Sequence, residues 1–254
     1  MFDARSALVV VSVEDVDDER PRFIHDEFRF EVAENDATEG AQVGFVQAED
    51  RDGAPFNSFV YAFHSGDPAS EAAFSVDGGT GAVTLRHALD RERRARHRFV
   101  VVAYAAESPA AATSGTATVV VDVLDRNDNA PQFVDRTGTA GNGNGNDSVV
   151  VRLSSFAPPG HVIATLSASD ADDGVNAQLT YSLDRRGSDD EVAHLFRVDP
   201  RRGTLSVASR LPTSGLFRLL IVAADAGAPA LSTSTALTVS VNKSVSEPTM
   251  AVRN

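Results

Sequence analysis

The sequence contains no cysteine, which excludes disulfide bonds and cysteine-based zinc sites. Positive charge is scarce: 23 Lys and Arg stand against 36 Asp and Glu, and the net charge of −13 argues against nucleic acid and anionic lipid as partners. No apolar run approaches the roughly 18 residues of a membrane span, so direct membrane insertion is not expected. The first residues do not read as a signal peptide. The excess of carboxylates favours a cation as the ligand.

The chain matches itself at a spacing of roughly 110–120 residues, the size of a domain rather than of a solenoid unit. Two repeats of this size fill most of the sequence. The matching segments are Pro21-Arg22-Phe23 with Pro131-Gln132-Phe133, Phe74-Ser75-Val76-Asp77 with Phe196-Arg197-Val198-Asp199, Gly81 with Gly203, and Leu89 with Leu211.

Short β-branched segments recur in both repeats, separated by clusters of Gly, Pro, Asp and Ser. The clearest are Phe99–Val102, Val119–Leu124, Val149–Leu153 and Leu237–Val241. No long stretch has helical apolar spacing. The pattern predicts an all-β chain of tandem seven-stranded Greek-key β-sandwiches with an immunoglobulin-like architecture. Ala7–Val13 reads as the closing strand of a preceding repeat, so we interpret the chain as a fragment of a longer protein.

Between the repeats, oxygen-bearing side chains gather in one segment. Its sequence is Asp125-Arg126-Asn127-Asp128-Asn129, followed by Ala130-Pro131-Gln132-Phe133. Alternate side chains of an extended segment face opposite sides, so such a strip can hold cations on both flanks. Ca²⁺ suits it best, because Ca²⁺ takes six to eight oxygen ligands in flexible geometry. An acidic turn is the alternative interpretation, since Asp, Asn and Pro all favour turns.

Four further motifs accompany this segment in a fixed order. They are Val32-Ala33-Glu34-Asn35, Leu89-Asp90-Arg91-Glu92, Asp170-Ala171-Asp172 with Gly174 and Asn176, and Ala223-Ala224-Asp225. Together the five motifs resemble tandem extracellular cadherin repeats of the non-classical, protocadherin-like kind, and the resemblance covers nearly the whole chain. It implies a closing strand and linker of a preceding repeat over 1–19, repeats over 20–129 and 130–243, and a tail over 244–254.

The resemblance also implies three calcium ions at the central junction. The acidic and amide side chains that would bind them are Glu34, Asp90, Glu92, Asp125, Asn127, Asp128, Asp170, Asp172 and Asp225, and the backbone carbonyls are those of Arg126, Asn129 and Asn176. The set contains eight carboxylates, against the six positive charges of three Ca²⁺ ions. Without metal the carboxylates would repel one another, so we expect the two repeats to be loosely coupled when empty and locked when filled.

The two outer junctions depart from this pattern. Upstream, the candidate ligands are Asp15, Asp17, Asp18, Asp50 and Asp52, but Ala105 stands where the second repeat has Asp225, so we expect fewer or weaker ions there. Downstream, the acids are replaced: Ser154 is expected at the place of Glu34, Leu211-Pro212-Thr213-Ser214 replaces Leu89-Asp90-Arg91-Glu92, and Lys243 replaces Asp125. We therefore expect no calcium below the second repeat.

The resemblance implies the extracellular part of a plasma-membrane protein that takes part in calcium-dependent cell–cell adhesion, with other cadherin ectodomains, like or unlike, as partners. A non-adhesive spacer or tether and a receptor surface for a heterophilic ligand stay open as alternatives. Paired carboxylates also build glycosidase sites, but the acids lie in repeating linkers and no nucleophile elbow or phosphate loop is present, so we expect neither an enzyme nor a catalytic residue. The chain has no tryptophan, the residue that the family's best-known adhesive contact inserts.

Three smaller features complete the sequence. Asn146 and Asn242 match the N-glycosylation pattern. Residues 138–146 form a glycine- and asparagine-rich insert, interpreted as a surface loop. The basic run Arg91–Arg98 is interpreted as a solvated turn between strands, with docking of an acidic partner or glycan as the alternative.

Overall fold

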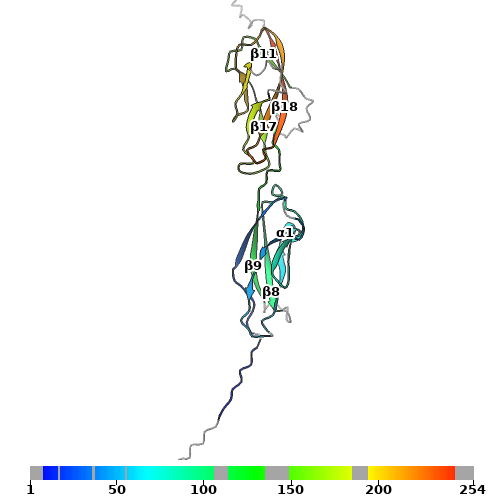
Figure 1. Ribbon diagram of the computed structural model, residues 1–254, viewed down its shortest axis with the longest axis vertical. Helices are drawn as coiled ribbons and strands as arrows, with labels where there is room; N and C mark the ends of the chain where they lie inside the picture. The colour runs from blue at the N-terminus through cyan, green and yellow to red at the C-terminus, as the bar shows by residue number, and fades with distance from the viewer. Residues whose placement is uncertain are drawn as a thin grey trace, which may run out of the picture. The chain divides into compact units, whose positions relative to one another are not determined.

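The computed structural model describes residues 8–16, 18–35, 38–54, 56–105, 114–134, 149–184 and 194–243. The chain divides into two compact units, Met1–Asp125 and Arg126–Asn254, called the first and the second repeat below. Strands dominate both units, as the sequence predicts (Figure 1).

The described residues of the first repeat form three sheets. Four strands in the order β2-β9-β8-β5 form one sheet, β3-β7-β6 form the opposite one, and β1-β4 form a short pair. β2 runs parallel to β9 and the other neighbours are antiparallel. The strands are β1 (Arg22–Phe23), β2 (Glu27–Ala33), β3 (Gln42–Phe45), β4 (Ala48–Glu49), β5 (Phe59–Gly66), β6 (Phe74–Val76), β7 (Ala82–Leu85), β8 (Arg96–Ala105) and β9 (Ser114–Leu124).

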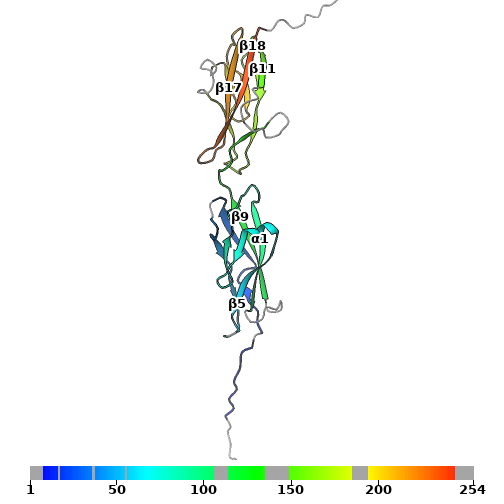
Figure 2. The same cartoon turned by 90° about the vertical axis from the view of Figure 1, so that its right-hand side faces the viewer.

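The second repeat has the same topology, with sheets β11-β18-β17-β14, β12-β16-β15 and β10-β13 (Figure 2). The parallel pair is again the one between the early strand β11 and the last strand β18. The strands are β10 (Gln132–Val134), β11 (Val149–Ser154), β12 (Val162–Thr165), β13 (Ser167–Ser169), β14 (Thr180–Leu183), β15 (Phe196–Val198), β16 (Thr204–Val207), β17 (Gly215–Ala224) and β18 (Ser232–Asn242).

The predicted β-sandwich is confirmed, and the four strands singled out in the sequence lie within β8, β9, β11 and β18. Within its described residues, each repeat shows nine strands where seven were expected. The difference comes from short interruptions: three residues separate β1 from β2, and two separate β3 from β4, so a single expected strand appears as two pieces.

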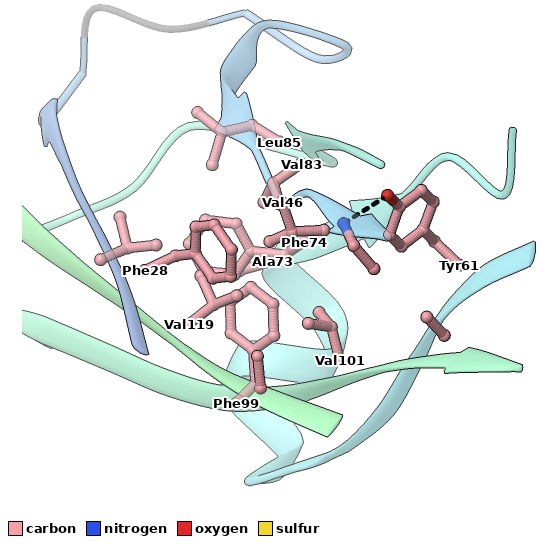
Figure 3. Close-up of a cluster of buried hydrophobic side chains, with 14 of the residues drawn as sticks. Phe28, Val46, Tyr61, Ala73, Phe74, Val83, Leu85, Phe99, Val101 and Val119 are labelled. Carbon is pink, nitrogen blue, oxygen red and sulfur yellow. Dashed lines mark hydrogen bonds between the residues drawn. The ribbon is translucent and has the colours of Figure 1, made fainter. Parts of the chain in front are cut away.

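Apolar side chains from both main sheets of the first repeat meet in one core. Phe74 and Phe99 are 0% and 1% exposed and stack with their ring centroids 5.2 Å apart. The Tyr61 hydroxyl lies at the edge of this core and accepts a hydrogen bond of 2.8 Å from the Ala48 amide (Figure 3). In the second repeat, Tyr181 accepts the equivalent bond from the Ala168 amide, also at 2.8 Å. The internal repeat therefore extends to individual core contacts.

Two glycines that match in the sequence, Gly81 and Gly203, are required for the same structural reason. Gly81 and Gly203 both take positive φ angles, +70° and +63°. A Cβ atom at either position would lie 2.3 Å from a backbone oxygen, that of Val46 or of Leu166. Only glycine fits this close approach between strands.

One short helix, α1 (Pro68–Ala73), links β5 to β6 in the first repeat (Figure 1). Asp67 caps it, accepting hydrogen bonds from the amides of Ala69 and Ser70 at 3.0 and 3.2 Å, and Pro68 stands at its first turn. Both are sequence signals of a helix start. The helix was not predicted because six residues are too few to show apolar periodicity.

The segment Ala7–Val13 is expected to close a preceding repeat, and its pairing in that repeat stays a prediction. Residues 8–16 form no strand, and Leu8, Val9, Val11 and Val13 are 77–91% exposed. A strand needs a neighbour to pair its backbone groups, and the described residues supply none to this segment.

Candidate metal centre

The first acidic cluster (Glu34, Asp90 and Glu92) lies in the first repeat. Glu34 directly follows β2, while Asp90 and Glu92 occupy the turn before β8. A carboxylate oxygen from each of the three lies within 4.8 Å of the other two. Glu34 is 0% exposed, and its Oε2 accepts a hydrogen bond of 2.7 Å from the Arg91 amide. The sequence spacing of 56 residues between Glu34 and Asp90 thus closes into one cluster.

Hydrogen bonds in the backbone hold this cluster together. The Glu34 amide donates to the Leu124 carbonyl at 3.1 Å, and the Asn35 amide donates to the Leu89 carbonyl at 3.1 Å. Leu89 itself is 3% exposed. A buried leucine therefore anchors the turn that carries the acids, which explains why the leucine heads the motif.

Asp125 follows β9 at the end of the first repeat, and Arg91 links it to the cluster. The Arg91 Nη1 atom lies 3.4 Å from Asp125 Oδ1 and 3.9 Å from Glu92 Oε1. The guanidinium offsets part of the repulsion among the carboxylates. Sequence reasoning missed this role, because Arg91 was considered only as part of the basic run.

The second acidic cluster (Asn127, Asn129, Asp170, Asp172 and Asp225) lies in the second repeat. Asp225 follows β17, is 5% exposed, and accepts hydrogen bonds from the Gly227 amide at 2.9 Å and the Leu231 amide at 3.0 Å. The side-chain nitrogen of Asn127, Nδ2, donates to the Pro229 carbonyl at 2.6 Å and to Asp225 Oδ1 at 3.3 Å. Asn127 is thereby fixed against the loop that follows β17.

Asp170 and Asp172 occupy the loop after β13. The Asp172 amide donates to Asp170 Oδ1 at 3.1 Å, and Asp172 is 7% exposed. Asn129 Nδ2 donates to Asp172 Oδ1 at 2.8 Å. Burial raises the pKa of Asp170, and the charges of Asp172 and Asp225 raise it further, against the hydrogen bond from the Asp172 amide.

Two oxygens of the second cluster are available to bind a cation. Asn127 Oδ1 and Asp170 Oδ2 are buried, and within the described part of the chain neither accepts a hydrogen bond. A buried polar atom without a hydrogen-bond partner costs free energy, and coordination of a bound ion is one ordinary way to recover that cost. The side-chain oxygens in both clusters are carboxylate or amide oxygens, the hard ligand atoms that Ca²⁺ takes. The residues present therefore fit calcium.

Two further predicted ligands are Asp128 in the linker and Asn176 between β13 and β14. Asp128 is exposed and accepts a hydrogen bond of 2.7 Å from Asn129 Nδ2, and its amide donates to the Arg126 carbonyl at 2.9 Å. Asn176 is half-buried in a turn closed by its amide bond to the Asp173 carbonyl at 3.1 Å.

The upstream candidates gather in the first repeat as the second cluster does in the second. The Asp52 amide donates to Asp50 Oδ1 at 3.1 Å, as Asp172 does to Asp170, and the Gly53 amide donates to Asp15 Oδ2 at 2.6 Å. Burial raises the pKa of Asp52, and the charges of Asp50, Asp15 and Asp18 add to this, against the hydrogen bond from the Glu19 amide.

Two differences separate this upstream group from the second cluster. The backbone amide of Glu19 donates to Asp52 at 3.2 Å, as the backbone amide of Asn129 donates to Asp172 in the second cluster. The side chain at this place is therefore a carboxylate upstream and a neutral amide in the second cluster. Ala105, 5% exposed, ends β8 where Asp225 follows β17. Asp17, a further predicted ligand, lies outside the described residues.

At the far end of the second repeat the structure corrects one position. β2 pairs Ala33 with Leu124, and β11 pairs Ser154 with Asn242. The next backbone amide, that of Glu34, donates to the Leu124 carbonyl, and the amide of Ser155 donates to the Asn242 carbonyl. Ser155, not Ser154, therefore occupies the place of Glu34, because the loop to Gly160 is one residue shorter than the loop to Gly40.

This end carries apolar and basic groups where the first repeat carries acids. Phe156 is 69% exposed and lines, with Pro158, Arg210 and Lys243, a surface pocket of about 530 Å³. Leu211 is buried like Leu89, so the turn is anchored in the same way although its acids are gone. The substitution changes the chemistry of the end and not its fold.

The basic run is mostly occupied by ion pairs within the first repeat. Arg94 binds Asp67 through both guanidinium nitrogens, Arg96 binds Asp122, and Arg98 Nη2 lies 4.0 Å from Glu27 Oε2. The run comprises a turn and the start of β8 rather than a turn alone.

Of the two glycan candidates, Asn242 is exposed at the end of β18, and Asn146 lies outside the described residues. None of the helices among the described residues is long and apolar enough to cross a membrane.

Comparison with known proteins identifies the family. The Cadherin domain family matches residues 28–124 and 150–242. Human Protocadherin-7 is 33% identical over 252 residues, which cover 96% of this chain and 21% of that protein. Human Protocadherin-16 is 36% identical over 224 residues, which cover 86% of this chain and 6% of that protein. The chain thus spans about a fifth or less of the length of these two relatives.

Among solved structures, a cis-dimer of repeats EC3-6 of protocadherin gammaB7 aligns with a TM-score of 0.77 and 28% identity, covering 91% of this chain and 54% of that one. Cadherins and protocadherins are adhesion proteins, not enzymes, and the prediction that the chain is no enzyme is confirmed on that ground. The matches cover most of both repeats, and the chain belongs to the cadherin family.

Proposed function

We propose that this chain is a calcium-binding segment of a cadherin ectodomain in which the metal stiffens the connection between the two repeats. The observation that carries the proposal is the pair of buried oxygens, Asn127 Oδ1 and Asp170 Oδ2, that accept no hydrogen bond among the described residues. They lie in a cluster with two buried carboxylates, Asp172 and Asp225. Calcium would satisfy the oxygens and offset the charge at once.

The proposed ligands come from both repeats. Asp125 is the last residue of the first unit, and Asn127 and Asn129 of the second acidic cluster lie within four residues of the start of the second unit at Arg126. Three ions are proposed here, bound by the side chains of Glu34, Asp90, Glu92, Asp125, Asn127, Asp128, Asp170, Asp172 and Asp225 and the carbonyls of Arg126, Asn129 and Asn176. When bound, calcium supplies positive charge and fixes the positions of its ligands, and it takes no part in catalysis.

Fewer or weaker ions are proposed upstream and none below the second repeat. Upstream, the charges of Asp15, Asp18 and Asp50 act on Asp52, but Ala105 brings no carboxylate. Below the second repeat, Ser155, Pro212, Ser214 and Lys243 stand at the places of acids. A lysine where Asp125 stands would repel a divalent ion.

In the cell, we propose that the segment belongs to the extracellular part of a plasma-membrane protein and serves calcium-dependent cell–cell adhesion. Its relatives are cadherins. The partners would be other cadherin ectodomains, like or unlike; one structural relative forms a cis-dimer. Repeat boundaries at 20–129 and 130–243 belong to the same proposal, as does a glycan on Asn242.

Small-angle scattering with and without a calcium chelator tests the mechanical part of the proposal. Removal of calcium should broaden the distribution of angles between the repeats, while circular dichroism shows that both sandwiches stay folded. Calcium affinity should lie in the roughly 10⁻⁵ to 10⁻³ M range of extracellular sites. The same scattering curve in calcium and in chelator would refute the stiffening role, and no heat of calcium binding in calorimetry would refute the site.

A further inference from the structure

A histidine lies in the core of the first repeat where the second repeat has a phenylalanine. His97 on β8 pairs with Val121 on β9, and Phe217 on β17 pairs with Val239 on β18. Both side chains are buried, at 5% and 8% exposure. His97 packs edge-on against Phe74 at 5.1 Å between ring centroids, and Phe217 packs in the same manner against Phe196 at 5.7 Å. An aromatic ring fills this place in both repeats, but only one of the rings titrates.

The polar edge of His97 is connected to α1. Its Nδ1 lies 3.2 Å from the Ser70 hydroxyl oxygen, and Ser70 is 0% exposed. The Ser70 hydroxyl donates to Asp67 Oδ2 at 2.8 Å. Since that proton is committed to the Asp67 carboxylate, Ser70 accepts from His97, which fixes the neutral imidazole with its proton on Nδ1.

Charged and titratable groups face His97 from three elements. Asp67 stands at the cap of α1, Arg94 in the turn before β8, and His87 after β7. Arg94 Nη2 donates to Asp67 Oδ2 at 2.8 Å, so much of the negative charge of Asp67 is already neutralised. A second positive charge on His97 would meet the Arg94 guanidinium with little compensation.

We propose that His97 is an acid-sensitive latch between α1 and the sheet of the first repeat, closed when the imidazole is neutral and released when it is protonated. Protonation would put a charge into the core beside Phe74 and Arg94. The added proton goes to Nε2, because Nδ1 already carries the proton that Ser70 accepts, so the hydrogen bond to Ser70 is not itself the cause of release. The buried charge beside Arg94 is the cause, and it favours an open state of the segment that links β5 to β6. The second repeat has no such latch at the equivalent place, because Phe217 carries no ionisable group.

The direction of the pH effect follows from the burial of the ring. Burial lowers the pKa of His97 below its ordinary value of 6.5, and the charge of Arg94 lowers it further, while Asp67 acts in the opposite direction. The unfolded chain then binds more protons than the folded one in the interval below pH 6.5. Stability of the first repeat is fully present above about pH 6.5 and falls as the pH drops through the folded pKa of His97.

Denaturant unfolding of the full chain in chelator, followed through separate NMR signals of the two repeats, tests the latch. Between pH 7.5 and 5.5 the unfolding constant of the first repeat should rise by up to about tenfold, the limit set by the one unit between the ordinary histidine pKa of 6.5 and pH 5.5. His97→Phe, which copies the second repeat, should lose this extra pH dependence. His161→Gln, at an exposed histidine of the second repeat, is the matched control and should keep it.

An NMR titration of the His97 ring in the wild-type chain gives a second readout that does not depend on the folding of any variant. The result expected is a pKa below 6.5. A ring that titrates at or above 6.5, or a His97→Phe chain that keeps the full pH dependence of the wild type, would overturn the proposal.

Discussion

The two repeats have separate cores with matching contacts, and they differ at the end where each repeat's last strand finishes. Tyr61 and Tyr181 make the same hydrogen bond, and Leu89 and Leu211 anchor the same turn. After that turn the first repeat carries Asp90 and Glu92, whereas the second carries no acid at the matching positions. The comparison teaches that the sandwich does not depend on the acids, which leaves the metal ligands free to change from one junction to the next.

The largest effect should come from removing a shared ligand at the central junction. Asp172→Ala and Glu92→Ala should each lower calcium affinity by about tenfold or more, which corresponds to about 1.4 kcal/mol, because each carboxylate is proposed to contact more than one ion. Calorimetry measures the loss. Asp173→Ala, at an exposed neighbour of Asp172, is the control, and equal losses for Asp172→Ala and Asp173→Ala would show that the proposed ligand register is wrong.

Changing Asp225 should give a smaller and more local effect, because it makes the second repeat resemble the first, which has Ala105 at this place. Asp225→Ala should remove chiefly the ion nearest the second repeat. It should also destabilise that repeat by about 1–3 kcal/mol, since the amides of Gly227 and Leu231 lose their acceptor.

Asp225→Asn separates these two effects, because it keeps an acceptor oxygen but loses the charge. Its calcium affinity should fall while its denaturation midpoint in chelator stays near that of the wild type. An Asn variant with unchanged calcium binding would contradict the ligand role of Asp225.

The two tyrosines should respond alike, because their contacts are alike. Tyr61→Phe or Tyr181→Phe leaves a buried amide, of Ala48 or Ala168, without its acceptor. Each change should cost about 1–3 kcal/mol in the repeat that carries it. Denaturation monitored separately for each repeat checks this, and calcium affinity serves as the control that should not change. A cost in only one repeat would break the equivalence of the two cores.

The smallest effect is expected at the far end of the second repeat. Lys243→Ala should leave the number of bound calcium ions unchanged, whereas Asp125→Ala, at the matching place in the first repeat, should reduce calcium binding. Equilibrium dialysis against calcium compares the two variants. A change in the number of bound ions for Lys243→Ala would indicate a metal site where none is proposed.

Much of the fold could be predicted from the sequence, because the same strand-like segments recur in both repeats. The β-branched runs and the paired Phe74 and Phe196 place most of the core. The sequence could not show α1, which depends on a local cap at Asp67 and not on periodicity. It also misplaced Ser154 by one residue, because the alignment followed Gly40 and Gly160 across loops of different length, while strand pairing fixes the register.

The candidate site was partly visible in the same way. Acidic motifs spaced far apart predicted the members of both clusters, since the family's motif order links Glu34 to Asp90 and Asp172 to Asp225. The role of Arg91 beside Asp125 was hidden, because an ion pair depends on which side of a turn the guanidinium takes. The two buried oxygens without partners were equally out of reach, because burial is a property of the packed structure.

A crystal structure of the chain grown in saturating calcium tests the central claim most directly. The account predicts ordered ions at the roughly 2.3–2.6 Å coordination distance of calcium from Asn127 Oδ1 and Asp170 Oδ2. It predicts none near Ser155 and Lys243. Asn127 Oδ1 and Asp170 Oδ2 without metal in such a crystal, or an ion bound beside Lys243, would contradict it.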